Sequence, residues 1–205
     1  MAKRNIVFSK GSYYHIYNRG CNKQKIFYDE ENYLFLLRKV HIYAAKFNIT
    51  IIAYCLMPNH YHFFIKQNSD LPVNDFIKFL FNSYSKAINK KYKRTGTLFE
   101  GPFKAIQVEG YDYMKELCRY IHRNPGDDGL VNNIEDWKYS NYLEWIEKRN
   151  GKLFDKESRD MLFIGIDHYK KFVMDYTSSK QFLHQMNKFL EELRKRGKKT
   201  YEADL

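Results

Sequence analysis

The sequence predicts an α+β fold in which an antiparallel sheet carries helices on one face. Short segments rich in β-branched and aromatic residues, typical of strands, alternate with longer segments in which apolar residues recur at helical spacing. Two of the strand-like segments are separated by only two residues, Pro and Asn, which predicts an antiparallel hairpin. The order of the segments then defines the topology.

Four strands are expected. Residues 12–18, SYYHIYN, are aromatic and β-branched, and residues 49–57, ITIIAYCLM, form the continuous apolar run of a buried strand. The hairpin partner of the second strand is HYHFFIKQ, residues 60–67. The fourth strand is the short segment KAIQVEG, residues 104–110.

Three helices are expected between and after these strands. The first spans residues 29–47, begins at Asp29 as N-cap, and is expected to bury Leu34, Leu37, Ile42 and Ala45. The second spans residues 73–93 and repeats apolar residues at i, i+4 spacing, namely Phe76, Leu80, Tyr84 and Ile88. The third spans residues 111–124 and is expected to stop at Pro125.

The resulting order is strand–helix–strand–strand–helix–strand, followed by a further helix. It is the order of the split βαβ, or ferredoxin-like, fold, an antiparallel sheet with helices on one face. After residue 130 the sequence becomes rich in Trp and Tyr, and a helix is expected at residues 180–198. The chain is therefore divided into residues 1–130, the α+β domain, and residues 131–205, a mainly helical C-terminal extension.

Composition points to a basic protein that binds a polyanion. The 205 residues carry a formal net charge of +11, which favours nucleic acid over a membrane as partner, although a merely basic protein is the alternative. The longest apolar run is too short to span a bilayer, and no signal peptide is expected. The three cysteines are widely spaced, which argues against a disulfide framework or zinc knuckle and favours a reducing cytoplasm.

Two histidines stand one residue apart in LMPNHYHFFI, residues 56–65. Side chains i and i+2 of a strand share a face, so His60 and His62 are expected to point the same way and could hold one metal ion. The more common alternative for such a pair, taken alone, is two separately hydrogen-bonded surface histidines.

A third ligand and a nucleophile are available in the helix LCRYIHRNP. Tyr120 and Asn124 are spaced i, i+4 and so share a helix face. Asn124 could give its amide oxygen to the ion, and a phenol beside a phosphate-binding metal suggests attack on phosphorus by Tyr120. The alternative is that Tyr120 is a core residue, one of 18 tyrosines.

Several stretches resemble the single-tyrosine HUH transposases, also described as IS200-like transposases. MPNHYHFFI resembles the His-hydrophobic-His core of these proteins, and YIHRNP resembles their tyrosine-helix motif. YHIYNRG with IFYDEENYLFLL resembles their first strand and helix, and GTLFEGPFKAI the stretch before their last strand. WKYSNY, residues 137–142, resembles the tail motif of the REP-associated tyrosine transposase branch. The motifs lie in the expected order over residues 12–145.

The resemblance implies a ferredoxin-like catalytic domain over residues 1–130 that acts on single-stranded DNA beside a hairpin. Tyr120 would be the nucleophile, leaving a 5′-phosphotyrosine and a free 3′-OH. His60 and His62 would bind Mg²⁺ or Mn²⁺, with Asn124 as the third ligand, and Mn²⁺ is expected to bind more tightly. The resemblance of the tail to the REP-associated branch favours a monomer, and a homodimer is the alternative.

Basic and aromatic side chains are candidates for holding the DNA. Arg19 follows the first strand, and a basic cluster ends the second helix, namely Lys90, Lys91, Lys93 and Arg94. Further basic residues lie near the two ends of the chain, namely Lys3, Arg4, Lys10, Arg194, Lys195, Arg196, Lys198 and Lys199. The aromatic candidates for base stacking are Tyr14, Tyr17 and Phe103. For any one charged residue, a solvated surface position is as plausible as DNA contact.

Three other functions are weighed against the transposase. A domesticated or inactive hairpin-DNA-binding protein of the same fold remains the main alternative, although all four site residues are present. An RNA-binding ferredoxin-like module would carry an RNP pattern, and HYHFFIKQ lacks its Gly-aromatic-Gly core. A zinc-histidine hydrolase is not supported, because the sequence has neither HExxH nor another closely spaced histidine pair.

Overall fold

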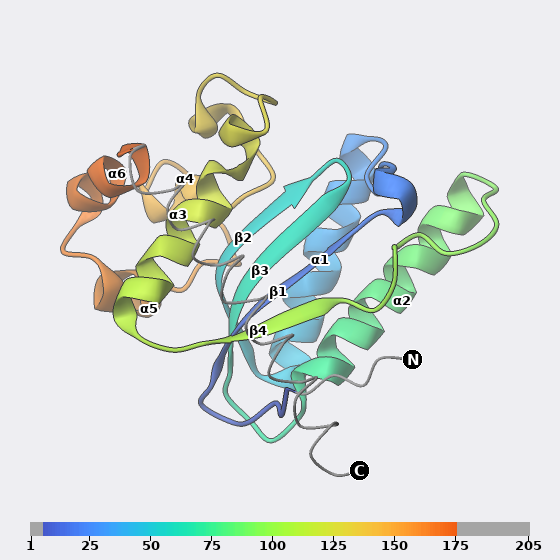
Figure 1. Cartoon of the computed structure of the whole chain (residues 1–205), viewed down its shortest axis with the longest axis horizontal. Coiled ribbons are helices and arrows are strands. Elements are labelled where there is room, and N and C mark those ends of the chain that lie inside the picture. Colours follow the sequence, from blue (N-terminus) through green and yellow to red (C-terminus); the bar gives the residue numbers. More distant parts are fainter. Residues whose placement is uncertain (1–5, 176–205) are drawn as a thin grey trace, which may run out of the picture.

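A computed structural model describes residues 6–175, and its core is one four-stranded antiparallel sheet (Figure 1). The strands are β1 (Tyr13–Arg19), β2 (Ile49–Met57), β3 (His60–Gln67) and β4 (Lys104–Val108). Their spatial order is β2-β3-β1-β4, with every neighbouring pair antiparallel. The predicted α+β, ferredoxin-like sheet is therefore confirmed.

Helices cover both faces of this sheet. Helices α1 (Glu30–Phe47) and α2 (Val73–Lys91) lie together on one face, as predicted, whereas α3 (Tyr111–Asp127) lies on the other (Figure 1). Strand β2 contributes Tyr54 and Leu56 to the first core and Cys55 and Met57 to the second. Because β2 is buried on both faces, its sequence is continuously apolar instead of alternating.

The helices of the first face begin and pack mostly as expected. Asp29 caps α1 by accepting a hydrogen bond from the backbone N–H of Asn32 at 3.0 Å. The predicted buried face of α2 is confirmed, but that of α1 is wrong, since Leu34 is 40% and Ile42 55% exposed. The residues that α1 buries instead are Asn32, Tyr33, Leu36, Val40, Ala44 and Phe47.

Helix α3 continues past the predicted stop, because Pro125 lies inside its last turn and the helix ends at Asp127. Proline removes the hydrogen bond that its own nitrogen would donate, and its ring crowds the carbonyl one turn earlier, but the residues after it can still continue the turn. The carbonyls on either side are still used, since the N–H groups of Asp128 and Leu130 donate to Asn124 and Pro125 at 3.0 and 2.9 Å.

The described part of the C-terminal extension is helical and shares the second core with α3. It contains the 3₁₀ helix η2 (Ile134–Asp136) and the helices α4 (Tyr142–Trp145), α5 (Lys156–Leu162) and α6 (Ile166–Met174). A second 3₁₀ turn, η1 (Cys21–Lys23), follows β1. No helix within residues 6–175 is long and apolar enough to cross a membrane. The helix expected at 180–198 and the basic residues at 3–4 and 194–199 lie outside the described residues.

The WKYSNY segment covers the outer edge of β2. The backbone N–H of Leu56 donates to the carbonyl of Tyr139 at 2.9 Å, and Ser140 forms an isolated bridge with Cys55. The indole N–H groups of Trp137 and Trp145 donate to backbone carbonyls of the same strand at 3.2 and 3.0 Å. The edge is therefore closed to pairing with another strand.

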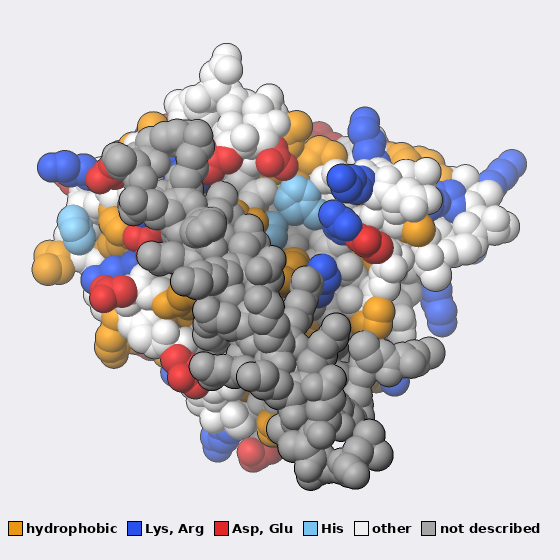
Figure 2. Space-filling model, in the orientation of Figure 1, with side chains coloured by type: hydrophobic (Ala, Val, Ile, Leu, Met, Phe, Trp, Pro, Cys, Tyr) orange, Lys and Arg blue, Asp and Glu red, His pale blue; other side chains and the backbone are white. Residues whose placement is uncertain are grey.

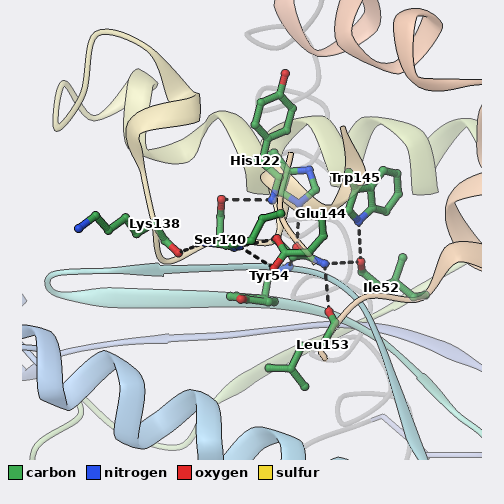
Figure 3. Close-up of polar contacts among 11 residues, drawn as sticks. Ile52, Tyr54, His122, Lys138, Ser140, Glu144, Trp145 and Leu153 are labelled. Atoms are coloured by element: carbon green, nitrogen blue, oxygen red, sulfur yellow. Dashed lines mark hydrogen bonds and ion pairs between the residues drawn. The ribbon is translucent and has the colours of Figure 1, made fainter. Parts of the chain in front are cut away.

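Asn141 joins this segment to both the sheet and α3. Its partners on β2 and α3, namely Ile52, Tyr54 and His122, lie close together in Figure 3. Its Oδ1 accepts from the backbone N–H of Tyr54 at 2.8 Å and from Nε2–H of His122 at 2.9 Å. Its Nδ2 donates to the carbonyl of Ile52 at 2.9 Å. One buried carboxamide thus holds β2 and the tyrosine-bearing helix together.

Candidate functional site

The four residues predicted from the two motifs come together between β3 and α3. His60 begins β3, immediately after the hairpin turn, and its Nε2 lies 2.9 Å from Oδ1 of Asn124 on α3. The ring of Tyr120 meets the ring of His62 edge-on, with centroids 5.2 Å apart. The i, i+2 spacing on a strand and the i, i+4 spacing on a helix therefore face one another, as the sequence predicts.

The hairpin turn and η1 fix how His60 is presented. The Nδ2 of Asn59 donates to the carbonyl of Lys23 at 3.3 Å, so the Oδ1 of Asn59 faces His60 and accepts its Nδ1–H at 2.7 Å. Gly20 lets the chain before η1 lie close to the hairpin turn, and its N–H donates to the carbonyl of Asn59 at 2.7 Å. Any other residue would be too large at this position, because a Cβ would lie 2.0 Å from the carbonyl oxygen of Gln24.

The Nε2 of His60 is then turned toward Asn124. In the neutral tautomer that donates Nδ1–H to Asn59, this nitrogen is an acceptor, and so is the Oδ1 of Asn124 that lies 2.9 Å away. A cation held between or beside them would attract both.

His62 is buried beside a histidine that the sequence analysis did not single out. Its Nδ1 lies 3.0 Å from Nε2 of His15, a β1 residue that is 1% exposed. Burial is the main cause that lowers the pKa of His62 well below its usual value, and burial lowers the pKa of His15 to about 3. Both imidazoles are therefore neutral at physiological pH, which is the form that binds metals.

Tyr120 is held protonated by its surroundings. Burial raises the pKa of its phenol to about 12, and the interaction with the Asn124 side chain acts in the opposite direction. Ionisation at neutral pH therefore requires additional positive charge beside the ring.

His60, His62 and Tyr120 border a cavity of about 340 Å³ with a basic rim. Its lining comprises Tyr17, Asn18, Arg19, Lys23, Asn59, His60, His62, Glu100, Lys104 and Tyr120. Arg19 forms a two-contact ion pair with Glu100, and the contact from Nη2 to Oε1 measures 2.9 Å. Figure 2 shows histidine side chains near the middle of this face, with Lys and Arg side chains next to them.

The other sequence-predicted DNA contacts are not gathered at the cavity. Lys90, Lys91, Lys93 and Arg94 lie at the C-terminal end of α2, and none of them lines it. Lys91 pairs with Asp29 at 2.7 Å, and Arg94 contacts the Tyr28 hydroxyl.

Only one of the three aromatic stacking candidates reaches the cavity. Tyr17 lines it, whereas Tyr14 is completely buried and cannot stack on a base. Phe103 packs against the ring of Phe8 with centroids 6.5 Å apart.

Sequence reasoning missed His15, Asn59, Lys23, Glu100 and Lys104 as site residues. The available signal is strand alternation, since residues 15 and 17 of β1 share a face, and Tyr17 pairs with His62 in the sheet register. That signal can be used only once β1 is known to lie next to β3.

The donor set fits a divalent cation. Two imidazoles and one carboxamide oxygen converge, and Nε2 of His62 makes no hydrogen bond to any residue within 6–175. No group of three or more His, Cys, Asp or Glu side chains able to hold a metal occurs in that same range. A site with only three protein ligands leaves room for substrate oxygens on the metal.

Comparison with known proteins agrees with this geometry. Residues 8–124, more than half of the chain, match the model of the family described as transposase IS200-like. Among solved structures, a REP-associated tyrosine transposase bound to a REP hairpin aligns with a TM-score of 0.61 and 15% identity, over 77% of this chain and 96% of that chain. This likeness is evidence of a shared fold.

A more distant likeness carries no functional argument. The tRNA(His) guanylyltransferase of Saccharomyces cerevisiae aligns with a TM-score of 0.44 and 14% identity, over 84% of this chain and 80% of that one. No curated protein matches the sequence. The match that decides the family is the one over residues 8–124, and it contains both histidines, Tyr120 and Asn124. The chain belongs to the IS200-like transposase family.

Proposed function

We propose that this protein is a divalent-metal-dependent enzyme that cleaves and rejoins single-stranded DNA next to hairpins through a 5′-phosphotyrosine intermediate. The observation that carries the proposal is that Tyr120, His60 and His62 line one basic cavity and that Asn124 contacts His60 beside it. A purely structural role would not require a phenol, two imidazoles and a carboxamide to converge beside Arg19 and neighbouring lysines.

Tyr120 is the nucleophile in this proposal. Its hydroxyl oxygen bonds to the scissile phosphorus and loses its proton, the bond from phosphorus to the 3′ oxygen breaks, and that oxygen is protonated to a free 3′-OH. Rejoining is the reverse, in which a 3′-OH attacks the phosphotyrosine and Tyr120 recovers its proton. One phosphodiester is exchanged for another, so no nucleotide hydrolysis is needed.

The ligands are Nε2 of His60, Nε2 of His62 and Oδ1 of Asn124. A Mg²⁺ or Mn²⁺ ion held by them would supply Lewis-acid polarisation of the phosphate and positive charge beside the phenol. Imidazole nitrogens favour Mn²⁺, so we expect tighter binding of Mn²⁺ than of Mg²⁺. The raised pKa of Tyr120, about 12, makes this charge necessary for ionisation at neutral pH.

The basic cavity rim and the end of α2 would hold different parts of the DNA. Arg19, Lys23 and Lys104 line the cavity and would contact phosphates next to the cleavage point. The basic end of α2, near Lys90 and Lys93, would contact the hairpin backbone. The hairpin as partner is supported by the shared fold with a transposase that was bound to a REP hairpin.

A monomer is the proposed active form. All four site residues come from one chain, and Asn141 joins α3 to β2 of that same chain through buried hydrogen bonds. A homodimer that exchanged α3 between protomers would have to break these bonds. Light scattering coupled to size exclusion would test this, and a dimer that dissociates together with loss of cleavage would contradict it.

The proposal is tested by trapping the covalent intermediate. Labelled single-stranded hairpin DNA from the genomic neighbourhood is incubated with protein and Mn²⁺, then run on a denaturing gel. We expect a protease-sensitive adduct that is lost in Tyr120→Phe and kept in Tyr113→Phe, a control on the same helix that loses the same hydroxyl. A shift on a native gel without any adduct would instead favour the hairpin-binding protein.

A further inference from the structure

His15 lies outside the four proposed catalytic and metal-binding residues, and nothing in the reaction outlined above uses it. It occupies the middle of β1, where it is 1% exposed and stacks between Tyr17 and His62, with ring centroids 4.8 and 5.2 Å away. The edge of its ring also meets Tyr120, at 6.2 Å. A histidine buried this deeply in a sheet requires a polar partner.

The only hydrogen-bond partner of His15 within the described residues is the proposed metal ligand His62. Nε2 of His15 lies 3.0 Å from Nδ1 of His62, while the other ring nitrogen of His15, Nδ1, is buried without a hydrogen-bond partner. Stability alone does not account for this arrangement, because a phenylalanine would fill the same space and leave no more buried nitrogens without a partner than His15 does. The single bond to His62 is the feature that a phenylalanine could not provide.

The direction of that bond decides which nitrogen of His62 can bind a cation. If His62 donates its Nδ1–H to His15, the lone pair of its Nε2 is left for a metal. If His15 donates instead, Nε2 of His62 carries the proton and cannot coordinate. The partner of one ring nitrogen therefore sets the function of the other.

We propose that His15 is a positioning residue that accepts Nδ1–H from His62 and so keeps Nε2 of His62 available for the divalent cation. Asn59 acts in the same way on His60, whose Nδ1–H it accepts at 2.7 Å. Both imidazoles then present Nε2. This inference rests on the proposed function for its metal, but the tautomer it assigns to His62 is a property of the metal-free protein.

Two measurements on the full chain test the proposal. Long-range ¹H–¹⁵N correlation spectra of the metal-free protein report which nitrogen of His62 is protonated, and we expect Nδ1. Calorimetric titration with Mn²⁺ alone compares the wild type with His15→Phe, which keeps a ring but removes the acceptor. We expect affinity about 10- to 100-fold weaker in this variant, the usual effect of removing a hydrogen-bond partner of a metal ligand.

Control variants separate this role from a structural one. His15→Gln keeps an acceptor and is expected to recover part of the affinity, and His41→Phe makes the same change at an exposed position of α1 and is expected to have no effect. Thermal unfolding of His15→Phe should stay near that of the wild type, because the variant removes one unpartnered nitrogen and creates another.

A proton on Nε2 of His62, or equal Mn²⁺ affinity in the wild type and His15→Phe, would overturn the inference. Either result could occur while the Tyr120 adduct still forms, which would leave the proposed function intact. The converse result can also be distinguished. If Nδ1 of His62 carries the proton and His15→Phe binds Mn²⁺ more weakly, but the wild type forms no adduct, the positioning role of His15 is supported and the cleavage reaction is refuted.

Discussion

Replacing Asn141 by leucine tests whether the C-terminal extension holds the tyrosine helix in place. Leucine has the same branched heavy-atom skeleton as asparagine, although its methyl groups are bulkier, and it lacks both the acceptor and the donor. The change removes the acceptor for the N–H of Tyr54 and for Nε2–H of His122, and the donor to the carbonyl of Ile52. All of these groups are buried, so water cannot replace the lost partner.

The expected loss of stability follows from the groups left without a partner. A buried donor without an acceptor costs roughly 1–3 kcal/mol, and two donors, from Tyr54 and His122, lose their acceptor. The carbonyl of Ile52 keeps the indole N–H of Trp145 at 3.0 Å, so its loss is partial. The sum is about 2–6 kcal/mol, a large part of the stability of an ordinary domain.

Urea unfolding followed by circular dichroism measures this loss, with adduct formation as a second readout. Asn133→Ala is the control, since Asn133 is exposed and its side chain caps only η2 through one 3.0 Å bond. We expect the control to lose about 1 kcal/mol or less. If the free energy of unfolding of Asn141→Leu lies within about 1 kcal/mol of the wild-type value, roughly the contribution of a single hydrogen bond, the buried carboxamide does not hold α3 against the sheet.

Three further predictions concern charge. Burial lowers the pKa of His122 to about 4 from an unfolded value near 6.5, so the unfolded chain binds more protons than the folded protein between these pH values. The free energy of unfolding should therefore fall by up to about 3 kcal/mol as the pH drops through this window. Urea unfolding should show a shallower fall in His122→Gln, and an equal fall would contradict the assignment. Glu100→Gln, which removes a carboxylate from the cavity rim, should tighten single-stranded DNA binding several-fold by fluorescence anisotropy, whereas Glu31→Gln, a control paired with an arginine on α1, should not. Lys104→Ala should weaken binding and reduce the slope of log affinity against log salt by about 1, and an unchanged slope would place this lysine off the DNA path.

The parts of the fold that the sequence predicts correctly are those with an unambiguous period. The four strands and α2 carry apolar patterns that fit only one face or one continuous run, and their positions are close to those observed. Helix α1 has apolar side chains all around, including Leu34 and Ile42 on the exposed side, so periodicity does not identify its buried face. Pro125 was expected to end α3, but a proline in the last turn removes too little hydrogen bonding to do so.

The residues of the candidate site also fall into those that the sequence predicts and those that it does not. Residues linked by local spacing, the histidine pair and the tyrosine with its asparagine, can be predicted because i, i+2 on a strand and i, i+4 on a helix are fixed geometries. His15 and Glu100 cannot, since the pairing of β1 with β3 places His15 against His62, and a long loop brings Glu100 to the cavity. Long-range pairing, and not residue type, is what the sequence pattern leaves open.

The two sides of α3 explain why the extension matters to the chemistry. Tyr120 and Asn124 face the histidines, while His122 faces Asn141, Tyr142 and Tyr169 on the opposite side of the helix. A nucleophile displaced by about 1 Å can lose about 100-fold in rate, so in the proposed reaction whatever fixes α3 against the sheet also fixes the attack geometry of Tyr120. The family match ends at Asn124, yet the contacts that hold the far side of this helix come from residues 141–173. The extension is therefore part of the proposed catalytic architecture, because it holds the tyrosine helix on the side away from His60 and His62.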